Sequence, residues 1–184
     1  MGYLRLVSNA GDARQPHDDP CLEVFAREVE YIIRTLSRLG STDAEIEDLC
    51  QEAYLALRRT WAAYDPSRPI RPYLFGIAFR VTSSYRRRFY REMPLAFVEV
   101  EDPECRPDSA FATKQDRLLL LAALDRVPLH RRAVLIMHDF DEVPMPEIAA
   151  TLSIPRFTAY SRLRKARREL ASAVRRLAKK GTPR

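Results

Sequence analysis

The chain has 184 residues, of which 46% are hydrophobic and 30% charged, and its formal net charge is +6. A chain of this size forms one or two small domains, and its basic excess permits a nucleic-acid partner. No apolar run approaches the roughly 20 residues of a membrane span. Residues 1–19 contain Asp12, Arg14, Asp18 and Asp19 and lack the apolar core of a targeting peptide. We expect them to form a flexible tail.

The cysteines argue against a disulfide framework and against a zinc site. Cys21, Cys50 and Cys105 show no C-x-x-C pairing and no metal-type spacing to the histidines. Reduced thiols in a cytosolic protein are the simplest interpretation. There is also no nucleophile–base pair and no glycine-rich phosphate loop, so we expect neither an enzyme, nor a metal, nor a cofactor.

The first elements in the chain are predicted to be helices. Asp19–Pro20 is an N-cap followed by proline at the first helical position, and apolar residues then recur at helical spacing up to Gly40. Thr42 and Glu45 match a capping box that opens a second, acidic helix. Residues 65–72 carry three prolines and must form a loop. A third helix is predicted from about residue 72 to residue 91.

The composition changes after the third helix. Residues 93–115 are acidic by contrast with their flanks and contain prolines, which predicts a flexible linker. Two more helices are predicted over residues 118–124 and 129–140, separated by Pro128. A short helix over residues 147–152, a break at residues 153–155 and a longer helix from residue 156 follow. The predicted fold is all-α: two small helical domains, at 20–92 and 116–180, joined by the acidic linker.

The last two predicted helices form a helix-turn-helix whose second helix is strongly basic. Lys and Arg that neutralise phosphates release counterions, which supplies most sequence-independent DNA affinity, while the first turns of a recognition helix read base edges. A solvated basic face is the alternative interpretation. The break at Pro155 and the small Ala149, which lets two helices approach closely, favour DNA binding.

The third helix provides a second basic surface, in which arginines alternate with aromatic residues. No acidic residue lies between Arg80 and Arg91, and Trp61 and Tyr64 stand just upstream, at the entry to the proline-rich loop. Arginines together with exposed aromatic rings suit single-stranded DNA, since unpaired bases stack on the rings. Core packing is the better interpretation for most single aromatics, but Tyr64 stands where a helix gives way to a loop.

Several segments in this order resemble the extracytoplasmic-function (ECF) type of bacterial sigma factor. They are residues 42–54 (TDAEIEDLCQEAY), 73–78 (YLFGIA), 124–128 (LDRVP), 147–149 (EIA) and 158–167 (TAYSRLRKAR). The resemblance covers about residues 20–178. It implies a sigma-2 type domain that binds core RNA polymerase and the −10 promoter element, and a sigma-4 type domain that binds the −35 element.

The resemblance also implies roles for individual residues. The −10 candidates are Trp61, Tyr64, Arg68, Arg71, Arg80, Ser84, Arg86, Arg87 and Arg88. The −35 candidates are Arg156, Thr158, Tyr160, Ser161, Arg162, Arg164, Lys165, Arg167 and Arg168. The residues expected to face the polymerase are Asp48, Gln51, Glu52, Tyr54 and Leu55. The implied partners are the coiled coil of the largest polymerase subunit, the flap of the second-largest subunit, promoter DNA and an anti-sigma factor, with no small-molecule substrate and no direct membrane insertion.

The sequence departs from the family pattern at a few positions. The family usually has Asn where this chain has Arg80 and Asp where it has Ser84, and the glycine common in the helix-turn-helix turn is Ser153. These departures bear on the promoter sequence and not on the fold. The expected location is the cytoplasm, or the membrane surface when an anti-sigma factor holds the chain there. A stand-alone helix-turn-helix regulator is the alternative, but it leaves the acidic second helix and basic third helix unexplained.

Overall fold

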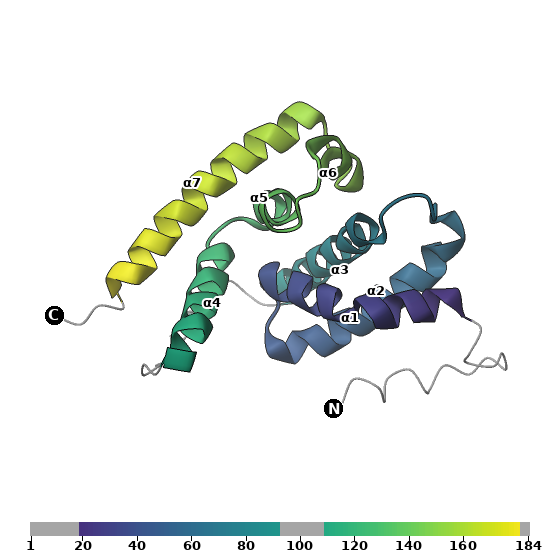
Figure 1. The fold of residues 1–184 in the computed structure, drawn as a ribbon, viewed down its shortest axis with the longest axis horizontal. Helices are drawn as coiled ribbons and strands as arrows, with labels where there is room; N and C mark the ends of the chain where they lie inside the picture. Colours follow the sequence, from purple (N-terminus) through teal and green to yellow (C-terminus); the bar gives the residue numbers. More distant parts are fainter. Residues whose placement is uncertain (1–18, 93–108, 181–184) are drawn as a thin grey trace.

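The computed structural model describes residues 19–92 and 109–180, and every regular element in these two ranges is helical. The first range contains α1 (Pro20–Arg38), α2 (Asp43–Thr60), the short η2 (Trp61–Ala63) and α3 (Ile70–Glu92). The second contains α4 (Ser109–Asp125), α5 (Leu129–Leu135), η3 (Ile136–Phe140), α6 (Met145–Thr151) and α7 (Arg156–Lys180). The predicted all-α fold of two helical units is confirmed (Figure 1).

The first two helices begin where their capping residues predict. The Asp19 carboxylate accepts a hydrogen bond from the backbone N–H of Cys21 at 3.0 Å, which satisfies one of the unpaired donors at the start of α1. The Glu45 carboxylate accepts from the backbone N–H of Thr42 at 2.8 Å, as a capping box requires. Gly40, with a φ of +89°, follows the end of α1.

Two boundaries differ from the prediction. Helix α3 begins at Ile70 instead of about Pro72, because a proline in the first turn lacks only an N–H that would have no helical partner. Helix α4 begins at Ser109 instead of about residue 118. Alanine at positions 110 and 112 favours the earlier start. Residues 93–108, which carry the rest of the expected acidic linker, lie outside the described residues.

The predicted helix over residues 129–140 is also interrupted. The α-helical part ends at Leu135, and residues 136–140 form a wider π-type turn. The backbone N–H of Asp141 donates to the carbonyl of Ile136 at 3.1 Å, which is the five-residue step of this turn. Glu142 then adopts a φ of +54°. The π turn carries Asp141 out of the helix line and toward α1.

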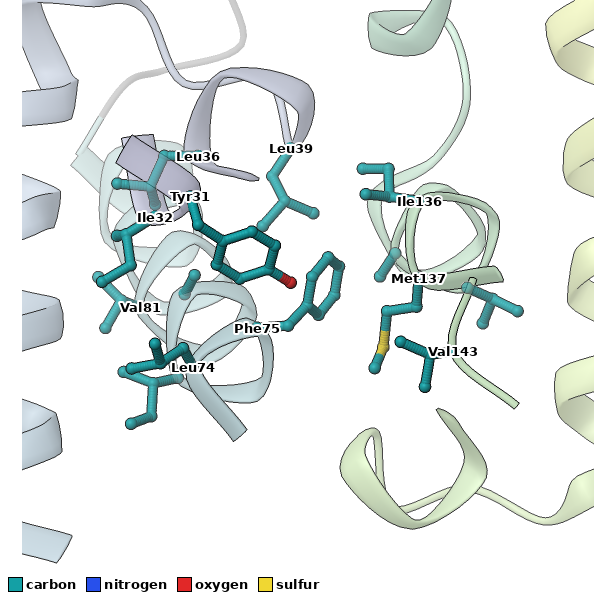
Figure 2. Packing of buried hydrophobic residues seen from close by; sticks show 14 of the residues in the cluster. Tyr31, Ile32, Leu36, Leu39, Leu74, Phe75, Val81, Ile136, Met137 and Val143 are labelled. Atoms are coloured by element: carbon teal, nitrogen blue, oxygen red, sulfur yellow. The ribbon is translucent and has the colours of Figure 1, made fainter. Parts of the chain in front are cut away.

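Helices α1, α2 and α3 pack against one another, and α7 packs along α4, α5 and α6. The two units also share one continuous hydrophobic core (Figure 2). Phe75 and Leu39 point across the boundary toward Ile136, Met137 and Val143, and four of these five side chains are at most 1% exposed. Burial of a large apolar side chain contributes roughly 1.5–3 kcal/mol. This shared core therefore holds the units together.

Candidate nucleic-acid interface

Three aromatic rings cluster at the entrance to the proline-rich loop. The Tyr64 ring stacks on that of Trp61 at a centroid distance of 5.4 Å, and the Tyr73 ring is tilted against Tyr64 at 5.1 Å. All three side chains are partly exposed. The η2 turn presents Trp61 and Tyr64, while Tyr73 comes from the first turn of α3 and donates a hydrogen bond to the Thr60 carbonyl at 3.2 Å. The loop thus presents a preformed aromatic platform.

Local hydrogen bonds hold the loop in shape. The Tyr64 hydroxyl donates to the carbonyl of Arg68 at 2.6 Å, and Asp65 accepts from the backbone N–H of Ser67 at 3.0 Å, an Asx turn. The Ser67 hydroxyl also donates to Asp65 at 2.7 Å. This bond first, and then the backbone bond, lower the pKa of the Asp65 carboxyl. The Arg68 guanidinium lies 3.9 Å from the Asp65 carboxylate, and because its side chain is 77% exposed this weak pair still leaves it open to an anionic ligand.

The arginines predicted for the −10 element do not share one surface. Arg80 and Arg87 are exposed, and Ser84 accepts from Arg87 at 3.4 Å. Arg86 instead donates to the carbonyls of Leu39 and Gly40 at 3.1 and 2.8 Å.

Two further arginines of this set pair with carboxylates. Arg71 bonds Glu28 at 2.9 Å and its guanidinium carbon lies 5.3 Å from the centre of the Tyr31 ring. Arg88 bonds Glu52 on α2 at 2.7 Å. The structure therefore gathers Trp61, Tyr64, Arg68 and Arg80 and directs Arg71, Arg86 and Arg88 to carboxylate or carbonyl partners.

Helix α2 presents an exposed polar stripe. Asp48, Gln51 and Leu55 are exposed at positions i, i+3 and i+7, and Glu52 is partly exposed at i+4. The Leu55 side chain is 46% exposed, so the stripe includes one large apolar side chain beside its polar ones. Tyr54 lies off this stripe, with its ring edge-on to Phe25 at 5.1 Å. The predicted polymerase-binding residues are thus brought together, except for Tyr54.

Helices α6 and α7 form the predicted helix-turn-helix. The turn places Ser153 at a φ of +52°, a left-handed conformation that a glycine adopts without strain. The buried stripe of α7 is formed by Ala159, Leu163, Ala166 and Ala173. The residues on the opposite side of the helix are Phe157, Tyr160, Ser161, Arg164 and Arg168.

The remaining −35 candidates lie beside this outer stripe. Arg156 and Lys165 are exposed, and Thr158 and Arg162 are partly buried. Arg167 donates to the Asp139 carboxylate at 2.9 and 2.6 Å, which lowers the pKa of that carboxyl. Arg167 is therefore tied to η3 in this structure.

Phe157 is the residue of this surface that the sequence interpretation missed. Its side chain is 83% exposed, in the first turn of α7. The signal was present in the sequence, because the positions of Ala159 and Leu163 fix the buried face and leave position 157 directly opposite.

The two described cysteines are buried, and burial raises the pKa of each of the Cys21 and Cys50 thiols to about 11. They are therefore unreactive at neutral pH. Within residues 19–92 and 109–180, no group of His, Cys, Asp and Glu is arranged to hold a metal ion. The described helices also include none long and apolar enough to cross a membrane.

These features define a class of protein with two distinct nucleic-acid surfaces. One is a helix-turn-helix with an exposed basic and aromatic recognition face, as duplex readout requires. The other is an aromatic platform with arginines, which suits unpaired bases. A transcription factor that both recognises and opens a promoter needs this combination.

Comparison with known proteins agrees with that class. Residues 24–92 match the family model "Sigma-70 region 2" and residues 117–170 match "Sigma-70, region 4". The sigma factor NccH of Alcaligenes xylosoxydans xylosoxydans is 23% identical over 158 residues, which is 83% of this chain and 85% of NccH. The ECF sigma factor SigE of Mycolicibacterium smegmatis is 28% identical, over 80% of this chain and 59% of SigE.

A solved structure has the same fold. It is the sigma factor RpoE of Bartonella quintana in complex with the anti-sigma factor NepR, with a TM-score of 0.61 and 19% identity over 83% of this chain and 98% of that chain. The chain described here belongs to the sigma-70 family, and within it to the ECF sigma factors. It is a promoter-recognising subunit of RNA polymerase.

Proposed function

We propose that the two surfaces divide promoter recognition between them. The observation that carries this proposal is that one chain presents both surfaces. One is the aromatic platform at Tyr64, and the other is the exposed stripe of α7, opposite the buried face of that helix. A stand-alone operator-binding regulator needs only the second. The platform therefore favours promoter opening over simple duplex binding.

The −10 element is assigned to the platform and the arginines beside it. An unstacked base of the non-template strand would lie against Tyr64 and Trp61, with Arg68 and Arg80 near the phosphates. Extrusion of a base costs a few kcal/mol, and stacking on an aromatic ring returns roughly 1–3 kcal/mol per base. The aromatic platform is already formed in the free chain. Its side chains therefore lose little conformational freedom when a base binds to them.

The −35 element is assigned to the outer stripe of α7. Tyr160, Ser161 and Arg164 lie in its first turns, where a recognition helix meets base edges. Arg156, Lys165 and Arg168 flank them and suit phosphates. Thr158, Arg162 and Arg167 are less available in this structure, and we assign them to the backbone or to support of the helix.

Core RNA polymerase is assigned to the exposed stripe of α2. Asp48, Gln51 and Glu52 offer polar contacts, and Leu55 offers an apolar one that stabilises the complex when it is covered. The resemblance to sigma factors points this stripe toward the coiled coil of the largest subunit and the second unit toward the flap.

An anti-sigma factor is a further partner that we propose, because the related RpoE has been solved with one. The chain would act in the cytoplasm, at the nucleoid, where the polymerase works, and an anti-sigma factor would hold it inactive. It would bind and position DNA, and the polymerase would perform all the chemistry.

In vitro transcription tests the proposal directly. The full chain is added to core RNA polymerase with a library of bacterial promoter fragments as template. We expect transcripts with defined start sites that depend on the chain. Complete absence of chain-dependent start sites at every template would refute the assignment as an initiating factor.

Tyr64→Ala tests the division of labour. We expect this variant to bind promoter fragments in the closed state as the wild type does, but to leave the −10 thymines unreactive to permanganate. Permanganate reactivity equal to that of the wild type would contradict the role of the platform.

A further inference from the structure

Among the residues that the structure describes, the most exposed large apolar side chain lies on the recognition helix α7. Phe157 is 83% exposed, compared with 60% for Tyr160, 46% for Leu55 and 37% for Leu118. Burial of a phenylalanine normally contributes roughly 1.5–3 kcal/mol to folding, and this side chain forgoes that contribution. Its presence therefore does not serve the stability of the chain.

The position of Phe157 directs it at DNA. It is the second residue of α7, and it lies at helical spacing from Tyr160, Ser161 and Arg164, directly opposite the buried stripe. The first turn of a recognition helix meets base edges in the major groove. Arg156 beside it is exposed and suits the adjacent phosphate. An aromatic ring at this point meets the floor of the groove.

The major groove has one apolar feature that a phenyl ring can read, the C5-methyl group of thymine. We propose that Phe157 determines −35 specificity by packing on the methyl group of a thymine in that element. The proposal rests on the assignment of the −35 element to α7. Phe157 cannot donate or accept a hydrogen bond, so its selectivity comes from contact with the methyl group alone.

Replacement of thymine by deoxyuridine removes that methyl group and nothing else. The −35 duplex is first selected from a random library with the holoenzyme, and each of its thymines is then replaced singly. We expect one replacement to weaken wild-type binding about fourfold, the value of one buried methyl-sized group. Phe157→Ala should bind the thymine and deoxyuridine duplexes equally well, and its melting temperature should match the wild type. Leu118→Ala, which changes an exposed apolar residue on α4, should keep the wild-type preference.

Two outcomes would overturn this proposal: a wild type that is indifferent to every replacement, or a Phe157→Ala variant that still discriminates. Failure to select any preferred duplex at all is a different result, because it would overturn the −35 assignment itself.

Discussion

Gly40 lies where three charged side chains converge. Its φ is +89°, and a Cβ atom there would collide with the guanidinium groups of Arg132 and Arg86 and with the carboxylate of Asp125. Arg86 and Arg132 both donate to the carbonyl groups at the end of α1. One glycine thus allows two arginines to satisfy carbonyls that the helix leaves unpaired.

Gly40→Ala should lower the free energy of unfolding by at least about 2 kcal/mol. The cost of a non-glycine residue at positive φ adds to the cost of displacing the two arginines. Ser153→Gly is a matched control, since Ser153 also has a positive φ, of +52°. There, relief of strain is offset by the greater freedom of glycine in the unfolded chain, and the change should stay within roughly 0.5 kcal/mol. Urea denaturation measures both. A small loss for Gly40→Ala would mean that the arginines move aside at little cost.

At the scale of single residues, the sequence predicts surface roles better than long-range partners. Tyr64 is predicted to contact DNA because it stands where a helix ends, and its ring lies in an aromatic platform. Arg86 follows the same pattern of basic residues as Arg87, yet it bonds carbonyls of another helix. Periodicity cannot reveal this, because the partner is distant in the chain.

At the scale of elements, η3 and α7 are joined by one ion pair. Arg167 donates two hydrogen bonds to Asp139, and these are the main cause of the lowered pKa of the Asp139 carboxyl. A carboxyl whose pKa is lower in the folded state stabilises the fold above its unfolded pKa, and this contribution is lost as pH falls through the folded pKa. The pair therefore contributes fully at neutral pH, its contribution starts to fall at about pH 4, the unfolded pKa of an aspartate, and it is lost only below the lowered pKa of the folded state.

Asp139→Asn should cost roughly 0.5–1 kcal/mol at pH 7, because the Arg167 side chain is half exposed and solvent screens the pair. The difference from the wild type should narrow as pH falls below about 4 and vanish below the lowered pKa of Asp139, which denaturation curves across this range can measure. Release of Arg167 should also steepen the salt dependence of duplex binding by about one counterion. Asp116→Asn, at an exposed site on α4, is the control for both the stability measurement and the salt dependence of duplex binding. A cost that stays constant down to pH 3 would contradict the ionic origin.

The positions of the helices can be predicted from local sequence signals, whereas the π turn at residues 136–140 cannot. The capping residues Asp19 and Thr42 start α1 and α2 as predicted. The apolar pattern of residues 129–140 is compatible with a regular helix, and only packing against α1 explains why Asp141 is carried toward Tyr31. The early start of α4 at Ser109 was missed because acidic and proline-rich composition upstream masked its helix-forming residues.

At the scale of the whole molecule, the sequence predicts two helical units, and in the structure these units share one hydrophobic core. The hydrophobic cluster continues from Phe75 and Leu39 to Ile136 and Met137 without a break (Figure 2). Binary patterns along a chain show which face of a helix is buried but not against which neighbour. The joint core thus became apparent only in three dimensions.

Arg132 is the residue on which this joining depends most. Its guanidinium donates to the carbonyls of Val127 and Asp125 in its own unit and to that of Leu39 in the other. Burial lowers the pKa of Arg132 to about 10, so it remains charged at neutral pH. Asp125, whose carboxylate lies 3.0 Å away, supplies the countercharge. Loss of this side chain removes the arginine donor of the buried Val127 carbonyl. It also leaves the Leu39 carbonyl with Arg86 as its one arginine donor instead of two.

Arg132→Met keeps the apolar part of the side chain and removes every one of these hydrogen bonds. We expect the free energy of unfolding to fall by about 3–5 kcal/mol, the usual cost of breaking a buried charge network. The wild type should unfold in one calorimetric transition, because the shared core couples the units, and the variant should show two transitions or a calorimetric enthalpy above the van't Hoff value. Arg131→Met, which breaks the Arg131–Glu169 pair within the second unit, should cost about 1 kcal/mol or less and keep the single transition. A single transition in Arg132→Met would show that the hydrophobic contacts alone couple the two units.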